Sequence, residues 1–208
     1  IRDRLWLALV YALLLLYLLG RGEKKRPLVP LGLGTAGLCA ALVFQAASHT
    51  AGRLTVSVLD VGQGLSVALL SGGRAALVDC GGTGADNPGD TAADYFQSLG
   101  LSRIDLVVLT HYHEDHAGGI PELLERLEVG LLVLPDVEEE DPLRREITAL
   151  AEEKGIETLF LAEDADVTFG ESALRIYAPL GSGGANEEGL SVLCTAGDLS
   201  LIHISEPT

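Results

Sequence analysis

The sequence predicts an α/β domain, with a mixed sheet covered by helices, that follows two transmembrane α-helices. Its 208 residues combine a 48% hydrophobic content and a mean hydropathy of +0.31 with a net charge of −16, which a single soluble domain seldom does. The two properties separate along the chain. Basic side chains outnumber acidic ones seven to two up to Arg53, whereas acidic ones outnumber basic ones 28 to seven after it. Beyond Arg53, short apolar or alternating runs are interspersed with helical patterns, which is typical of an α/β domain.

The composition excludes three classes of protein. The hydrophobic content is too high for a disordered acidic chain. Three cysteines in 208 residues are too few for a small disulfide-stapled domain. The acidic excess argues against a stand-alone basic nucleic-acid-binding domain.

Two uncharged runs, 5–20 and 27–52, predict two transmembrane helices within a first domain at 1–52. A spanning helix needs about 20 apolar residues, so the second run is long enough and the first is slightly short. The arginines that flank the first run could complete it by extending their charged ends to the membrane surface. A signal peptide is the alternative interpretation of the first run, although a second hydrophobic run follows it rather than a mature domain.

Four basic residues stand in the loop at 21–26, between the two runs. Basic loops of this kind stay on the cytoplasmic side, so the second helix would deliver the following domain to the extracytoplasmic side. We therefore expect a multi-pass protein of the cell membrane, in contact with membrane lipid. Because the chain begins with Ile, we also expect further helices upstream.

The second predicted domain, 54–200, opens with strands that are separated only by glycine turns. Period-two and buried-strand patterns at 54–60, 65–71 and 74–79 predict a short meander. The chain then alternates between helix and strand patterns, which favours a mixed sheet covered by helices. Helices are predicted at 91–99, 120–127 and 142–154, and strands at 104–109, 130–134, 156–161, 167–169, 174–177 and 190–194.

A cluster of histidines directly follows the apolar strand at 104–109. Three of the five histidines in the chain, His111, His113 and His116, lie within six residues of one another together with Asp115. Imidazole and carboxylate groups are the ligands of zinc and comparable divalent ions. We predict that His111 and His113 share one metal, and that Asp115 and His116 face a second position about 3.5–4 Å away. The alternative is a chance cluster on a surface loop.

This H-x-H-x-D-H pattern, placed after a strand and before a glycine-led helix, resembles the signature of the metallo-β-lactamase superfamily. The resemblance implies an αββα sandwich and two divalent metal ions, zinc or manganese. It implies that Asp115 and His116 are catalytic as well as metal-binding. The segment 76–82 resembles the superfamily's strand that ends in Asp and Gly, so Asp79 would support the metal site through hydrogen bonds to ligand imidazoles. Asp60 is assigned to the same supporting shell, and a turn-capping role is the alternative for Asp79.

The D-V-G-Q-G sequence at 60–64 is similar to the opening of the metallo-β-lactamase domain in ComEC-type DNA-uptake channel proteins. This resemblance implies a nuclease that degrades one strand of incoming DNA, with DNA and other competence proteins as partners. The acidic excess opposes tight DNA binding, because phosphate affinity comes mainly from Lys and Arg. Two alternatives therefore stay open: a hydrolase of a small ester, thioester or lactam, and a non-catalytic membrane-anchored binding module. Gly62 and Gly64 fit either a close backbone approach or a simple hairpin turn.

The C-terminal part lacks several residues that the resemblance would require. Superfamily enzymes complete the site with a third His, a bridging Asp and usually a final His, but no His lies between His116 and Leu201. Asp198 is one candidate for the bridging Asp. We prefer a hairpin turn at 196–198 between strands at 192–195 and 199–201. The segment 201–208 looks like translated sequencing-adapter sequence, so we expect a non-native tail on a truncated domain, with His203 not a ligand.

Overall fold

The computed structural model describes residues 32, 34–41, 54–137, 139–179, 189–197 and 199–203. The chain divides into two compact units, 1–49 and 50–208. In the first unit, residues 34–41 are helical. Within the described ranges, no helix is both long enough and apolar enough to cross a membrane. The predicted span at 5–20, and most of the one at 27–52, lie outside those ranges.

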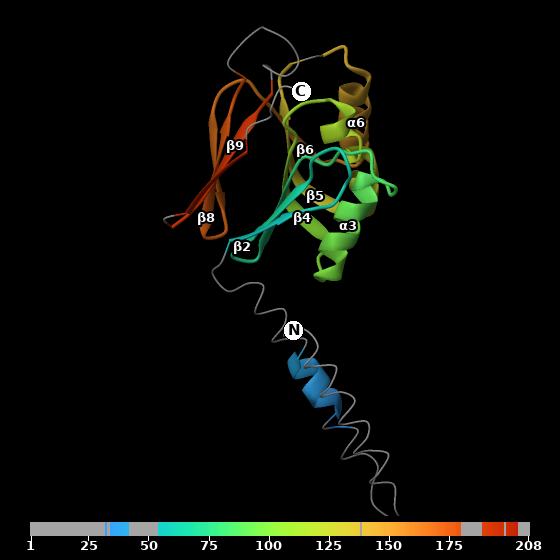
Figure 1. Ribbon diagram of the computed structural model, residues 1–208, viewed down its shortest axis with the longest axis vertical. Helices are drawn as coiled ribbons and strands as arrows, with labels where there is room; N and C mark the ends of the chain where they lie inside the picture. Colours follow the sequence, from blue (N-terminus) through green and yellow to red (C-terminus); the bar gives the residue numbers. More distant parts are fainter. Residues whose placement is uncertain are drawn as a thin grey trace, which may run out of the picture. The chain divides into compact units, whose positions relative to one another are not determined.

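The second unit contains two β-sheets that face each other (Figure 1). In the larger sheet, the first three strands are antiparallel and the remaining neighbours are parallel, so the predicted mixed sheet is confirmed. Its strands, in spatial order, are β1 (Thr55–Val58), β2 (Val67–Ser71), β3 (Arg74–Val78), β4 (Arg103–Val108), β5 (Glu128–Pro135) and β6 (Glu157–Leu161). The smaller sheet is antiparallel, with the order β10 (Leu199–His203), β9 (Ser191–Ala196), β8 (Ser172–Tyr177) and β7 (Ala165–Phe169).

Helices cover one face of the larger sheet and the smaller sheet covers the other (Figure 1). The helices are α3 (Pro88–Ser98), α4 (Glu114–Ala117), α5 (Ile120–Arg126) and α6 (Pro142–Glu153). Because side chains alternate along a strand, β2 sends Ala68 and Leu70 into the core beneath the helices, and Val67 and Leu69 into the core between the sheets. The described residues thus form three layers of the expected αββα sandwich, and none of them forms a helix on the outer face of the smaller sheet.

Two helix starts are fixed by side-chain caps. α3 begins at Pro88, three residues before the predicted start, because the Asn87 side chain accepts a hydrogen bond from Gly89 N–H (2.8 Å). Proline at the first helical position fits this start, since it has no N–H to satisfy. α6 begins where predicted, and the Asp141 carboxylate accepts from the N–H groups of Leu143 and Arg144.

The predicted hairpin near the C-terminus is confirmed. β9 and β10 pair antiparallel, with Ala196 opposite Leu199, and the turn between them contains Gly197 at φ +59°. Asp198 lies outside the described residues, as does the side chain of His203. The role of Asp198 as a metal ligand therefore stays an open prediction.

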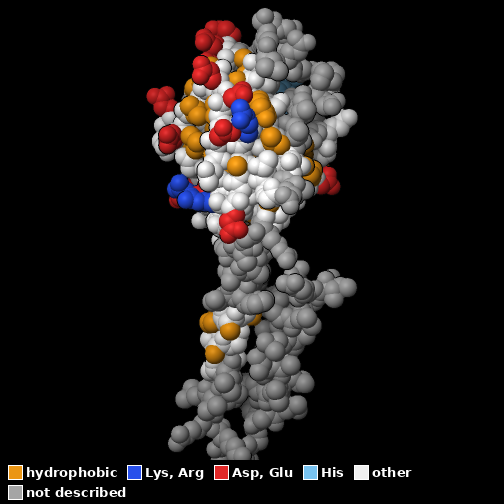
Figure 2. Space-filling view, turned by 90° about the vertical axis from the view of Figure 1, so that its left-hand side faces the viewer, with side chains coloured by type: hydrophobic (Ala, Val, Ile, Leu, Met, Phe, Trp, Pro, Cys, Tyr) orange, Lys and Arg blue, Asp and Glu red, His pale blue; other side chains and the backbone are white. Residues whose placement is uncertain are grey.

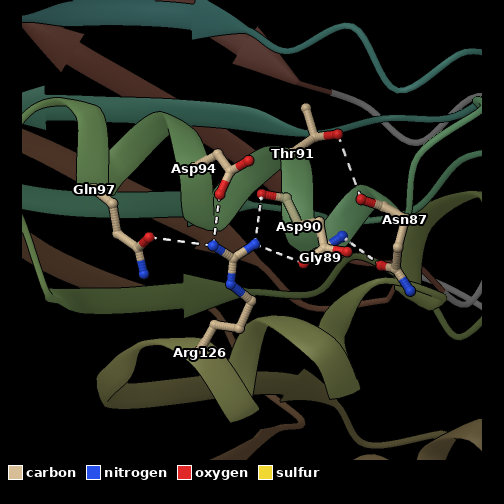
Figure 3. Close-up of polar contacts among 7 residues, drawn as sticks. All are labelled: Asn87, Gly89, Asp90, Thr91, Asp94, Gln97 and Arg126. Atoms are coloured by element: carbon tan, nitrogen blue, oxygen red, sulfur yellow. Dashed lines mark hydrogen bonds and ion pairs between the residues drawn. The ribbon is translucent and has the colours of Figure 1, made fainter.

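Arg126 joins α5 to α3 through several polar contacts (Figure 3). Its guanidinium donates to Asp90 Oδ1 (2.6 Å), to Asp94 Oδ1 (2.5 Å) and to Gln97 Oε1 (3.2 Å). α5 begins directly after the histidine cluster, so these contacts hold the element that follows the candidate site against its neighbour.

We expect Arg126→Ala to lower the thermal midpoint of the domain at low ionic strength. The loss should shrink in 1 M salt, because exposed ion pairs are screened there. Thermal denaturation at two salt concentrations tests this. Arg145→Ala is the control. It removes an exposed ion pair between α6 and Glu140, just before the helix, and should change the midpoint less. A salt-independent loss for Arg126→Ala would contradict an electrostatic role.

Candidate metal centre

The histidine cluster lies at the carboxyl end of β4, beside the end of β3. The ends of parallel strands meet at one edge of a sheet, and ligands bind in the crevice there. Backbone hydrogen bonds continue the sheet past the strand ends: Asp79 N–H donates to Val108 O and Leu109 N–H to Val133 O, both at 2.9 Å. The loops that carry Asp79 and His111 are therefore held side by side.

Tyr112 explains how two histidines come to lie on the same side of the loop. Its side chain is 2% exposed, packs in the core beneath the helices, and donates a hydrogen bond to Pro135 O (2.8 Å). The flanking residues, His111 and His113, share the opposite side, where their ring centroids are 4.8 Å apart. Alternation along an extended segment thus turns the H-x-H pattern into a pair of facing imidazoles.

Asp115 completes a group of three potential ligands. One ligand atom from each of His111, His113 and Asp115 lies within 4.8 Å of the others. His111 is buried, His113 is exposed and Asp115 is intermediate, so the group opens toward solvent on one side. Two imidazoles and a carboxylate fit a divalent metal ion such as zinc.

His116 lies against this group. Its ring centroid is 3.9 Å from that of His111, and its Nε2 is 3.8 Å from Asp115 Oδ2. Its Nδ1 is 2.8 Å from Asp79 Oδ2. The structure therefore brings together all four residues that the sequence predicts as metal ligands, with Nε2 of His116 directed toward Asp115.

Asp79 is fully buried and binds two groups of the centre. Besides His116 Nδ1, it accepts hydrogen bonds from Thr110 N–H (2.7 Å) and Thr110 Oγ1–H (2.8 Å). An Nδ1–H that donates to a carboxylate leaves Nε2 as the nitrogen available to a metal. The supporting role predicted for Asp79 requires such a hydrogen bond to a ligand imidazole, and the contact with His116 Nδ1 provides it. Asp60, assigned to the same shell, is exposed and accepts a long hydrogen bond from Gly62 N–H (3.4 Å), so its role stays a prediction.

Thr110 is a member of the site to which the sequence reasoning gave no role. Its hydroxyl donates to Asp79 and lies 3.0 Å from His111 Nδ1, so its oxygen can accept a hydrogen bond from an N–H at that nitrogen. Thr110 therefore connects the buried carboxylate of Asp79 to His111. The same carboxylate contacts His116 directly. The available signal was its place immediately before the first histidine, at the end of a buried strand.

The pKa of His111 is lowered from 6.5 to about 4, first by burial of the imidazole and second by the neighbouring His116. The imidazole is therefore neutral at pH 7, which is the form that binds metal ions.

Because this pKa is lower in the folded than in the unfolded chain, the unfolded chain binds more protons between about pH 6.5 and pH 4. We expect the stability of the metal-free domain to be complete above this window and to fall as the pH drops through it. Denaturant unfolding across the window tests the prediction, with His111→Gln as the comparison. The variant should lose this part of the pH dependence, and an unchanged dependence would contradict the assignment to His111.

Comparisons with known proteins agree with this geometry. The family model described as "Metallo-beta-lactamase superfamily" matches residues 59–208. Competence protein ComA of Neisseria gonorrhoeae is 34% identical over 113 residues, covering 54% of this chain and 15% of that protein. Hydroxyacylglutathione hydrolase of Stenotrophomonas maltophilia is 38% identical over 74 residues, 36% of this chain and 26% of that protein. Cleavage and polyadenylation specificity factor subunit 3-I of Arabidopsis thaliana is 36% identical over 85 residues, 39% of this chain and 12% of that protein.

The chain thus spans about a quarter or less of the length of these relatives. Among solved structures, a metallo-β-lactamase with a HARLDQ motif from Cronobacter sakazakii is similar with a TM-score of 0.51 at 18% identity, over 71% of this chain and 60% of that one. YhfI of Bacillus subtilis is similar with a TM-score of 0.50 at 16% identity, over 73% of this chain and 63% of that one. At these identities, the two structures show a shared fold.

Proposed function

Because the chain belongs to the metallo-β-lactamase superfamily of metal-dependent hydrolases, we propose that its domain hydrolyses phosphodiester bonds of DNA. The observation that carries the proposal is the convergence of His111, His113 and Asp115 on one point, next to His116. The choice of DNA is supported by the partial similarity to a competence protein and by the D-V-G-Q-G sequence at 60–64.

The four clustered side chains would supply part of the ligands of two divalent ions, zinc or manganese, and the remaining ligands would come from residues other than these four. When bound, such ions activate water and stabilise charge on the attacking and leaving oxygens of an in-line displacement. Thr110 and Asp79 fix the Nδ1 sides of His111 and His116, which directs both Nε2 atoms to the centre. The side chain of Asp115 is 42% exposed, so its carboxylate is within reach of solvent and of a substrate and could accept a proton during hydrolysis.

We further propose the cell membrane as the location, with the hydrolase domain on the extracytoplasmic side. The uncharged runs at 5–20 and 27–52 and the basic loop at 21–26 support this orientation. Membrane lipid, DNA and other competence proteins are the partners that this setting provides.

One observation favours a second candidate, a hydrolase of small thioesters. Acidic side chains outnumber basic ones on the face of the smaller sheet (Figure 2), and over the whole domain beyond Arg53 they do so 28 to seven. Such a surface repels nucleic acid, because phosphate contacts depend on Lys and Arg. The partial similarity to hydroxyacylglutathione hydrolase supports the same alternative.

A paired assay separates the two candidates. The purified protein is loaded with zinc or manganese and offered single-stranded DNA or a glutathione thioester, with a chelator as the metal-free reference. The DNA proposal expects metal-dependent cleavage that Asp115→Asn abolishes. Glu114→Gln, which makes the same charge change at the adjacent exposed residue, should keep the activity. Hydrolysis of the thioester alone would reject the DNA proposal, and hydrolysis of neither substrate would favour a binding module.

A further inference from the structure

Two glycine-containing loops outside the ligand motif hold the backbone of the metal ligands. One loop, 60–65, joins β1 to β2, and the other, 79–84, follows β3. We infer that Gly64 and Gly81 are positioning residues, which set the places of Asp115 and His116 through direct backbone contact. The inference rests on the proposed metal site but not on its substrate.

The hydrogen bonds between these segments end on the ligand residues themselves. Leu65 N–H donates to Asp115 O (2.9 Å), and Cys80 N–H donates to His116 O (2.7 Å). Both residues belong to α4, a helix of one turn, whose last carbonyls have no partners within the helix. The two loops supply these partners, so the orientation of α4 depends on segments that lie far from it in the sequence.

The two loops are also bonded to each other and to the end of α4. Gly81 N–H donates to Leu65 O (3.1 Å), and Gly119 N–H, just beyond α4, donates to Cys80 O (2.6 Å). The two loops and α4 are therefore joined by one network of backbone hydrogen bonds. A shift of either loop is transmitted to the ligand residues without passing through any side chain.

Glycine is required at Gly81 by close approach. A Cβ atom built there would lie under 3.0 Å from His116 N, from the carbonyl carbon of Asp115 and from Glu114 O. All three are backbone atoms of the ligand segment, so they cannot move aside as a flexible side chain would. The φ of Gly81 lies outside the left-handed region, and the effect of adding a methyl group there is therefore steric alone.

Gly64, in the other loop, also lies close to the backbone of the ligand segment. A Cβ atom at this position would lie 2.7 Å from Asp115 O and still closer to Gly81 O. Its φ of +153° also favours glycine. The D-V-G-Q-G sequence thus serves both of the roles considered for it, because its loop is a hairpin connection and also a close backbone contact.

The test compares Gly81→Ala with Gly100→Ala. Gly100 has φ +81° and open space around its Cβ position, so alanine there is strained but displaces nothing in the metal site. Zinc affinity is measured by competition with a chelating dye, and the geometry of the site by the absorption spectrum of the cobalt-loaded protein. We expect Gly81→Ala to weaken zinc binding by about 10- to 100-fold, as loss of a supporting contact does, and to alter the cobalt spectrum. Gly100→Ala should match the wild type in both.

A second measurement keeps the inference testable if Gly81→Ala does not fold. Hydrogen exchange of the wild-type protein is followed with and without zinc, at the amides of Leu65 and Cys80. Slower exchange at both amides on zinc binding supports the positioning role. Unchanged exchange there, or a folded Gly81→Ala with wild-type affinity and spectrum, overturns it. A wild-type protein that binds zinc without cleaving DNA would reject the proposed substrate and leave this inference standing.

Discussion

Replacing Asp79 by Ala should destabilise the domain and weaken its metal binding at the same time. The carboxylate is fully buried and accepts hydrogen bonds from Thr110 and from His116 Nδ1. Its removal leaves buried donors without an acceptor, at about 1–3 kcal/mol each. For three such donors the loss is at least about 3 kcal/mol, which is a large part of the stability of a typical domain. Asp79 itself holds φ +59°, a backbone region that alanine adopts less readily than aspartate, so the substitution adds some backbone strain to this loss.

Metal affinity should fall by about 10- to 100-fold in the same variant, because His116 loses the group that orients it. Urea denaturation of the metal-free protein and a zinc competition titration measure the two effects. Asp60→Ala is the matched control, since that carboxylate is exposed and its hydrogen bond is long. Equal effects of the two substitutions would show that the buried contact has no special role.

Replacing His113 by Ala should strongly weaken metal binding but, unlike the Asp79 substitution, should leave the stability of the metal-free domain nearly unchanged. The side chain is exposed, so the metal-free protein should be about as stable as the wild type. Metal affinity should nevertheless fall by more than about 100-fold, beyond the range expected for loss of a supporting residue, because a direct ligand is removed. Hydrolytic activity should fall to the level of the chelator-treated protein.

The same titration tests this variant, with Glu114→Gln as the control at the adjacent exposed residue. Wild-type zinc affinity in His113→Ala would remove this residue from the metal site. A large loss of stability without metal would instead indicate that His113 supports the fold.

The elements that could be predicted from the sequence are those with a local signal. Buried strands such as β5 show as apolar runs, here 131–134, and α6 shows as an amphipathic pattern directly after its cap, Asp141. The metal ligands could be proposed because His111, His113, Asp115 and His116 all fall within one six-residue segment. The start of α3 was misplaced because the Asn87 cap and Pro88 precede the helical pattern.

Contacts between distant segments left no local signal in the sequence, and the contact of Asp79 with a histidine was predicted only from the family resemblance. Thr110 acts through Asp79, which is 31 residues away in the chain, and Arg126 reaches Asp90, 36 residues away. The approach of Gly81 to the ligand segment depends on the pairing of β3 with β4, which the sequence pattern does not specify. A glycine in a loop predicts a turn, but not the backbone that it allows to come near.

The location of a bound ion tests the central claim most directly. Crystals of the zinc-loaded protein, measured on both sides of the zinc absorption edge, would show each zinc ion as an anomalous peak. The account predicts a peak at about 2.0–2.1 Å from a nitrogen of His111 and a nitrogen of His113, with Asp115 and His116 beside it. Zinc bound elsewhere, or an ordered loop with no peak among these four residues, would contradict it.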